Sequence, residues 1–321
     1  MSTDLTIRQA RLEDRESVLD INDNIYNGRD FLPHFYNDLV NNHQAFLCQQ
    51  HDGLVVAFVF LVAVDGGETV VGRGGRVRSS HTGKRILDKM FKTVLPNVYL
   101  PKLKRIAFCM NADGEYYINR VKKLEMLPGV KPAFSYVNSS YTGTLSRLVK
   151  RHTSEVKSNG VRHVDKSMLM RLFKSKSICE NLFPDDIMGI HMVPYKPIDS
   201  NVEQIVSGST LIVYSGDLEN TRENSNIVRG LLTVGTYYYC KTGLVCYIDV
   251  FGNEVNDFSL HLSEHLDKIQ SLPKNNIILY DVVTPVDMDL VIIDQEMRQV
   301  ANFQKKFNRY FYYSKFIKSN L

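Results

Sequence analysis

The chain has 321 residues and a formal net charge of +4, with 44% hydrophobic and 23% charged residues. This composition is ordinary for a soluble globular protein, and the length suits two domains of about 150 residues each. The small net charge requires no polyanionic partner, so we expect no nucleic-acid binding.

Five cysteines are scattered along the chain without a CxxC pair. An odd and dispersed set indicates free thiols in a reducing compartment. The N-terminal residues contain no apolar signal segment, and the longest apolar run, residues 54–64, is too short to cross about 30 Å of hydrocarbon as a helix. We therefore expect a soluble cytoplasmic protein without a membrane partner.

The first 145 residues alternate between strand-like and helix-like patterns. Strands are expected at residues 5–10, 45–49, 54–64, 69–77, 105–110 and 133–137, and helices at residues 12–28, 31–40, 86–91 and 115–127. Gly72, Gly74 and Gly75 weaken the fourth strand, which predicts a bulge or a close backbone approach there. The order of elements predicts a mixed α/β fold, with helices on both faces of a mixed sheet.

Residues 146–165 are polar and basic, and they are expected to link a domain at residues 1–145 to a second domain at residues 166–321. In the second domain, strands are expected at residues 188–194, 211–215 and 277–283, and two more at residues 231–250 about a turn at 241–243. Helices are expected at residues 168–173, 261–269 and 297–316. The last helix would bury the aromatic residues that alternate with basic ones near the C-terminus, with a nucleic-acid surface as the alternative.

A basic loop with one glycine, Gly83, connects the fourth strand to a helix. The unpaired N–H groups and the dipole at a helix start suit a phosphate or pyrophosphate, and Lys84 and Arg85 add positive charge. The alternative is a basic surface turn, and a single glycine does not decide between the two.

This loop is similar to the acetyl-CoA pyrophosphate loop of GNAT acetyltransferases, Gln/Arg-x-x-Gly-x-Gly/Ala. Ser80 falls at the first position, Gly83 at the central glycine and Arg85 at the last position, so only the central residue matches. A fuller resemblance to histidine N-acetyltransferases and their relatives lies in residues 26–33, 65–67, 76–77, 194–197, 201 and 248–252. The resemblance implies a GNAT fold followed by a second, degenerate GNAT-like domain.

It also implies an acetyl-CoA-dependent N-acetyltransferase without a metal, acting on the α-amino group of a free amino acid, with histidine the expected acceptor. The alternatives are a non-catalytic acyl-CoA-binding homologue and an acetyltransferase for another amino acid or a peptide N-terminus. The residues expected to bind the cofactor are Arg76, Val77, Arg78, Ser80, His81, Thr82, Gly83, Lys84 and Arg85.

Acetyl transfer requires a proton acceptor for the amine and a proton donor for the leaving thiolate. The resemblance places the donor on the helix after the fifth strand, where Tyr117 is preferred over Tyr116. Relatives carry a glutamate at the position of Arg73, and an arginine cannot act as this base. One alternative is that Glu68 or Asp30 accepts the proton through water. The others are that the amine arrives already neutral, and that the protein has lost activity.

Three residues are expected to contact the acceptor. Arg73 is suited to pair with a substrate carboxylate, with a surface or structural role as the alternative. Tyr26 and Asp30 lie on the loop that borders the amine site in this fold, and Asp30 is also the second candidate base.

His261 and His265 form an H-x-x-E-H pattern, in which two histidines share one helix face as zinc ligands do. No third ligand can be named from the sequence, so we expect a packed helix and no metal site.

Overall fold

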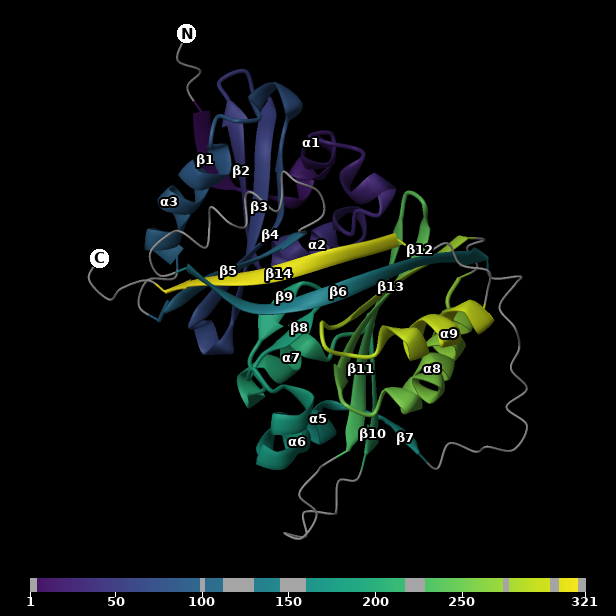
Figure 1. Ribbon diagram of the computed structural model, residues 1–321. Helices are drawn as coiled ribbons and strands as arrows, with labels where there is room; N and C mark the ends of the chain where they lie inside the picture. Colours follow the sequence, from purple (N-terminus) through teal and green to yellow (C-terminus); the bar gives the residue numbers. More distant parts are fainter. Residues whose placement is uncertain are drawn as a thin grey trace.

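The computed structural model describes residues 5–98, 102–111, 130–144, 160–216, 229–273, 277–300 and 306–316. One twelve-stranded sheet runs through the molecule in the order β1-β2-β3-β4-β5-β14-β6-β13-β12-β11-β10-β7 (Figure 1). The β4–β5 and β12–β13 pairs are parallel and the other neighbours are antiparallel, which confirms the predicted mixed α/β fold. Within the described ranges, no helix has the length and apolar character needed to cross a membrane.

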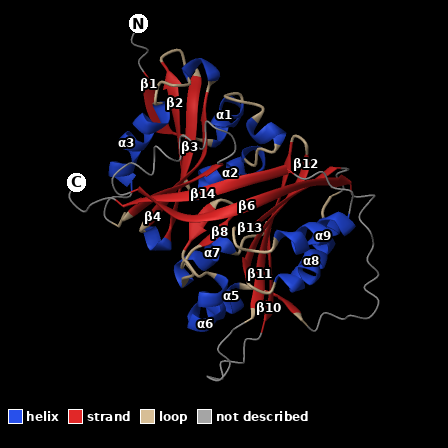
Figure 2. Cartoon of the chain, in the orientation of Figure 1, coloured by secondary structure: helices blue, strands red, loops and turns tan. Residues whose placement is uncertain are grey.

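We define the N-terminal half as residues 5–144. Its strands are β1 Leu5–Gln9, β2 Gln44–Gln50, β3 Val55–Val64, β4 Thr69–Val77, β5 Arg105–Asn111 and β6 Val130–Thr144, and its helices are α1 Arg15–Leu19, α2 Leu32–Asn42 and α3 Ile86–Val98. β3 is apolar along nearly its whole length because α3 covers one face of the sheet and α1 and α2 lie on the other (Figure 2).

The C-terminal half is defined as residues 160–316. Its strands are β7 Val161–His163, β8 Met188–Ile190, β9 Val193–Tyr195, β10 Thr210–Gly216, β11 Gly230–Cys240, β12 Gly243–Gly252, β13 Ile277–Pro285 and β14 Lys306–Phe316. Its helices are α5 Lys166–Lys174, α6 Lys176–Leu182, α7 Val202–Ile205, α8 Phe258–Ser271 and α9 Leu290–Val300. α5 begins where the side chain of Asp165 accepts a hydrogen bond from the Met168 N–H at 2.7 Å, which is a typical N-cap.

The two halves exchange their last strands. β14 lies between β5 and β6, and β6 lies between β14 and β13, so each half is completed by a strand from the other. The two long strands cross the middle of the molecule side by side (Figure 1). The predicted boundary at residues 146–165 stays a prediction, because residues 145–159 lie outside the described part.

Three predicted elements were wrong in type or extent. The last helix ends at Val300, and the aromatic segment after it is strand β14, because pairing with β5 and β6 supplies its backbone hydrogen bonds. The helix predicted over residues 12–28 is three short pieces, and Tyr26 and Asn27 have positive φ. The strand predicted at residues 188–194 is a hairpin, β8 and β9, that turns at His191 and Met192.

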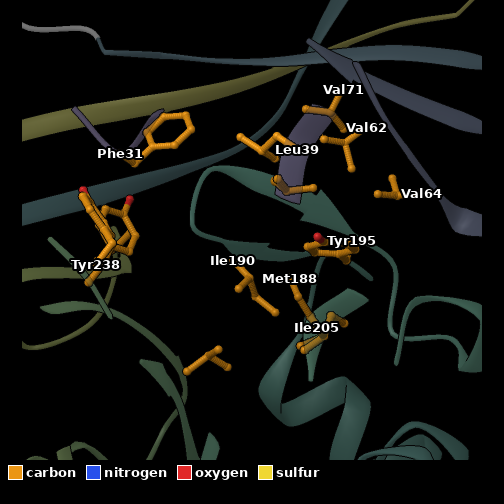
Figure 3. Packing of buried hydrophobic residues seen from close by; sticks show 14 of the residues in the cluster. Phe31, Leu39, Val62, Val64, Val71, Met188, Ile190, Tyr195, Ile205 and Tyr238 are labelled. Atoms are coloured by element: carbon orange, nitrogen blue, oxygen red, sulfur yellow. The ribbon is translucent and has the colours of Figure 1, made fainter. Parts of the chain in front are cut away.

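A single apolar cluster joins the halves. It contains Phe31 and Val71 from the N-terminal half and Ile190, Tyr195 and Tyr238 from the C-terminal half (Figure 3). Side chains of β4 and β12 belong to this same cluster. The shared core therefore brings β4 and β12 into the same region. β4 is the fourth strand of the sheet counted from β1 at one edge, and β12 is the fourth counted from β7 at the other, so we call them the fourth strands of the two halves.

Candidate functional site

The parallel pair β4–β5 opens part-way along its length. Pairing runs from Thr69 with Arg105 to Gly72 with Phe108, and no pair beyond Gly72 joins the described residues of these two strands. Strands that separate in this way leave backbone groups of β4 open to a ligand. This is the kind of splay that the family resemblance implies beside the acetyl group.

A bulge lies at the start of the opening. Opposite β3, Arg73 pairs with Phe60 and Arg76 pairs with Phe58, so Gly74 and Gly75 together face one residue. The predicted bulge is confirmed. Gly74 has φ +60, and a Cβ there would come within 2.7 Å of the Phe60 ring, so the position requires glycine.

Arg76 supports the bulge from inside the protein. Its side chain is buried, Nε donates to the Gly74 carbonyl oxygen at 3.2 Å, and its two terminal nitrogens pair with the Asp30 carboxylate at 3.0 and 3.2 Å. The predicted roles of Arg76 in cofactor binding and of Asp30 in substrate binding are therefore not supported by the side-chain geometry, because each group is engaged by the other.

Arg73 lies at the bulge with its guanidinium directed into the shared core. Its Cζ is 4.8 Å from the centroid of the Phe31 ring and 5.7 Å from that of Phe60, distances typical of cation–π contacts. Nη2 is buried without a hydrogen-bond partner in the described part of the chain, and no carboxylate there pairs with Arg73. A half-buried guanidinium with a buried, unpaired nitrogen and no counter-charge in the described part of the chain is suited to binding an anion.

The C-terminal half contributes the groups that surround this arginine. Burial lowers the pKa of His191 well below its usual value, and the charge of Arg73 lowers it further. Burial raises the pKa of Asp249 well above its usual value, while the His191 backbone N–H and the charge of Arg73 oppose that rise. Burial raises the pKa of Tyr195 to about 12. The sequence analysis assigned none of these three a role, although two of them lie in segments that resemble the family.

Tyr26 reaches the same region from the N-terminal half. Its ring is 52% exposed, yet the surrounding protein raises the pKa of its hydroxyl, and the charges of Cys109, Asp30 and Arg73 also act on it. The charge of Arg73 thus acts on the Tyr26 hydroxyl, which puts these two predicted substrate contacts within electrostatic reach of each other.

Glu68 lies at the other end of β4. Its carboxylate pairs with Lys104 at 2.5 Å. Arg73 lies five positions further along the chain, which is about 16 Å in an extended strand. The structure does not bring this predicted base to the opening. Tyr116 and Tyr117 lie outside the described residues.

The predicted pyrophosphate loop lies between β4 and α3. Val77 ends the strand, and Gly83 and Arg85 have φ +82 and +53, which turns the chain into the helix. The Ser80 hydroxyl and His81 Nδ1 are 2.9 Å apart, and the Nε2 atom of the buried His81 has no hydrogen-bond partner in the described part of the chain.

The loop presents its positive charge outward. The exposed residues on it are Ser79, Ser80, Thr82, Gly83, Lys84 and Arg85. Arg78 is held in place, because Nε donates to the Val55 carbonyl oxygen at 3.2 Å and Nη2 pairs with Asp20 at 2.8 Å. Burial lowers the pKa of His81, and the nearby charges of Lys84 and Arg78 lower it further.

The H-x-x-E-H pattern forms a buried hydrogen-bond network in the C-terminal half. The Thr233 hydroxyl bonds His261 Nδ1 at 2.9 Å and His265 Nε2 at 2.8 Å. The other ring nitrogens bond Ser215 at 2.9 Å and Tyr237 at 2.6 Å. Since every ring nitrogen is occupied by a hydroxyl group, these histidines pack α8 onto the sheet and are not arranged as metal ligands.

Comparisons with known proteins agree with this architecture. Residues 157–283 match the family model described as histidine N-acetyltransferase, C-terminal. A histidine N-acetyltransferase of Scomber australasicus is 23% identical over 273 residues, covering 80% of this chain and 78% of that protein. The histidine N-acetyltransferase of Xenopus tropicalis is 31% identical over 98 residues, or 28% of this chain and 30% of that protein.

Solved structures show the same fold. A tandem GNAT protein from the clavulanic acid biosynthesis pathway has a TM-score of 0.56 at 10% identity, covering 98% of both chains. Saccharomyces cerevisiae N-myristoyltransferase has a TM-score of 0.54 at 11% identity, covering 98% of this chain and 80% of that one. This chain is an N-acetyltransferase with a GNAT fold and a second, GNAT-like half, and it resembles histidine N-acetyltransferase.

Proposed function

We propose that this protein transfers an acetyl group from acetyl-CoA to the α-amino group of a free amino acid, with histidine as the acceptor. Similarity to histidine N-acetyltransferases supports the choice of histidine. The observation that carries the proposal is the Arg73 guanidinium at the β4 bulge, which is half-buried and whose Nη2 atom is buried without a partner in the described chain.

The α-carboxylate of an amino acid supplies the anion that Arg73 lacks. A hydrogen-bonded ion pair of this kind, formed away from water, contributes more than a neutral hydrogen bond. Phe31 and Phe60 hold the guanidinium in place, so little conformational freedom is lost on binding. An amine without a carboxylate leaves Arg73 unpaired and is therefore a poor acceptor.

The loop before α3 suits the diphosphate of acetyl-CoA, the co-substrate that supplies the activated acetyl group. Lys84 and Arg85 provide exposed positive charge, and the main chain of Gly83 lies at the start of the helix. The orphaned Nε2 of His81 is a further hydrogen-bonding group without a protein partner. Ser80, Thr82, Arg78 and Val77 would complete the cradle through hydroxyl or backbone groups.

The test measures release of coenzyme A thiol from acetyl-CoA in the presence of each free amino acid, histidinamide and histamine. We expect turnover with histidine and little with the two analogues that lack the carboxylate. Binding of coenzyme A without turnover on any amine would contradict the proposal and favour a non-catalytic acyl-CoA-binding protein.

Arg73→Gln connects the result to the residue. We expect kcat/KM for histidine to fall about 10- to 100-fold, the loss expected when a hydrogen bond to a charged group is removed. The preference for histidine over histidinamide should shrink by the same factor. Arg171→Gln, at an exposed arginine of α5, is the matched control and should leave both values unchanged.

A further inference from the structure

The acceptor amine must lose a proton before it can attack, and neither carboxylate that the sequence suggested as its acceptor, Asp30 or Glu68, is free at the opening. Asp30 is engaged by Arg76, and Glu68 lies at the far end of β4 with Lys104. A carboxylate of the C-terminal half is therefore considered as the proton acceptor.

Asp249, on β12 of the C-terminal half, has the required features. Its side chain is fully buried, and Oδ2 accepts a hydrogen bond from the His191 backbone N–H at 2.8 Å. The second oxygen, Oδ1, is buried without a hydrogen-bond partner in the described ranges. One oxygen thus fixes the carboxyl group in place, and the hydrogen-bonding capacity of the other is not used by the described chain.

A chain of contacts connects this carboxylate to Arg73. The His191 that holds Asp249 packs its ring against Phe31, with centroids 5.3 Å apart, and Phe31 lies 4.8 Å from the Arg73 guanidinium carbon. The charge of Arg73 also acts on the pKa of the Asp249 carboxyl. The unpaired guanidinium nitrogen of Arg73 and the unpaired carboxyl oxygen of Asp249 therefore belong to one region, reached from β4 in one half and β12 in the other.

We propose that Asp249 binds the α-ammonium group of the acceptor through Oδ1 and accepts its proton, while Arg73 holds the α-carboxylate. This inference rests on the proposed function. It assigns the second half a direct role: that half contributes a catalytic residue to a site whose splay and phosphate loop are in the first half. It also identifies the preferred acceptor as a zwitterion, because both charges of a free amino acid are matched.

The step is balanced as follows. The ammonium group gives one proton to Asp249, and the neutral amine forms a C–N bond with the acetyl carbon. The C–S bond breaks, and the sulfur takes the second proton from nitrogen to become the free thiol. Asp249 then releases its proton to solvent, so the products are one amide, one thiol and one proton.

The groups that face Asp249 are His191 from the β8–β9 turn, Arg73 from β4 and Tyr136 from β6. Burial lowers the pKa of His191 well below its usual value and raises the pKa of Tyr136 far above its usual value. Arg73 does not titrate in the relevant range. Protonation of Asp249 with falling pH should therefore appear as an acid limb in the profile of kcat/KM.

The test compares Asp249→Asn with the wild-type protein on histidine. Asparagine keeps an oxygen for the His191 N–H but cannot accept the proton, so kcat/KM should fall about 100- to 10,000-fold. The acid limb should disappear in the residual activity. Activity within threefold of wild type, or a loss that leaves the acid limb intact, would overturn the inference.

A matched control and a second variant keep the result interpretable. Asp281→Asn replaces another buried aspartate, on the neighbouring strand β13, which pairs with Arg29 at 3.0 Å; it should lower stability but keep the acid limb. If Asp249→Asn does not fold, Asp249→Glu should retain a carboxylate and show a shifted acid limb, and an unchanged profile would overturn the inference. Wild-type protein inactive on every amino acid would instead contradict the proposed function itself.

Discussion

The fourth strands of the two halves have opposite designs. β4 pairs with β5 over four residues and then separates at a bulge, whereas β12 pairs with β13 over six residues, from Leu244 to Asp249. The pairing of β12 with β11 has no register shift. The same topology therefore gives the N-terminal half a bulged fourth strand that leaves its parallel partner after four pairs, and the C-terminal half a regular one that keeps six.

The two halves also differ in the segments that pack beside the fourth strand. In the N-terminal half, an exposed basic loop leads into α3. In the C-terminal half, α8 is fixed to the sheet by hydroxyl groups that bond His261 and His265. Gly235 makes room for this contact, because a Cβ there would come within 2.6 Å of His265 Nδ1. On the roles proposed above, the second half supports the site of the first and contributes side chains to it.

The largest expected effect comes from removing β14, the strand of the C-terminal half that lies between two strands of the N-terminal half. A chain that stops after Val300 lacks β14, which lies between β5 and β6, so both strands lose a backbone partner. We expect no cooperatively folded protein, measured by circular dichroism and thermal unfolding. A chain that stops after Phe316 keeps β14 and is the control. A folded, cooperative product from the shorter chain would show that the halves are independent.

The next largest effect tests whether the glycine of the bulge, Gly74, has a role that a glycine in an ordinary turn does not have. Gly74→Ala introduces a strained positive φ and a contact with the Phe60 ring, so the bulge must shift. We expect kcat/KM to fall at least 10-fold while the protein remains folded. Gly53→Ala is matched, because Gly53 also has positive φ, +85, but a Cβ there meets no atom within 4 Å. Equal losses in both variants would contradict a specific role for the bulge.

A smaller effect concerns the C-terminal half, where the buried His261 and His265 make the free energy of unfolding depend on pH. Burial lowers the pKa of His261 and His265 to about 3, so the unfolded chain binds more protons than the folded one between about pH 3 and 6.5. Their contribution to stability is complete above pH 6.5 and is lost as the pH falls toward 3.

The measurement is the slope of unfolding free energy with pH in this window. His265→Gln removes one titrating group, so the slope should decrease by about 1.4 kcal/mol per pH unit, the value for one proton. His51→Gln, at an exposed turn of the N-terminal half, is the control. A slope unaffected by His265→Gln would mean that the buried network is protonated in the folded state.

Much of the N-terminal half follows from local sequence. The three glycines of β4 predict the bulge, since their lack of side chains is what the geometry needs. The last strand was not predictable in the same way, because residues 306–316 form a strand through partners about 170 to 210 residues away in the sequence. Periodicity reports local structure, and an exchanged strand is stabilised by distant chain segments.

The site itself was predictable only in part, for a related reason. Asp65 accepts from the Lys196 backbone N–H at 3.0 Å and from Asn201 at 2.9 Å, so segments that resemble the family join the two halves. The resemblance to the family identifies those segments in the sequence, but it does not show which residues they bring into contact. Asp249 lies in one of them, and its relation to Arg73 depends on the packing of the halves. Arg73 as a carboxylate partner could be proposed from residue type alone; a base in the other half could not.

The smallest expected effect concerns Glu68, the base suggested by proximity in sequence. Its carboxylate is partly exposed and paired with Lys104, and exposed pairs of this kind contribute little. Because β4 is extended, the same strand that places Arg73 in the core places Glu68 at its opposite end. Glu68→Gln should therefore leave kcat/KM for histidine within about twofold of wild type, while Asp249→Asn removes nearly all of it. A loss of more than 10-fold from Glu68→Gln would place the chemistry at the closed end of β4, and the contrast between an open and a closed fourth strand would no longer explain which half carries the site.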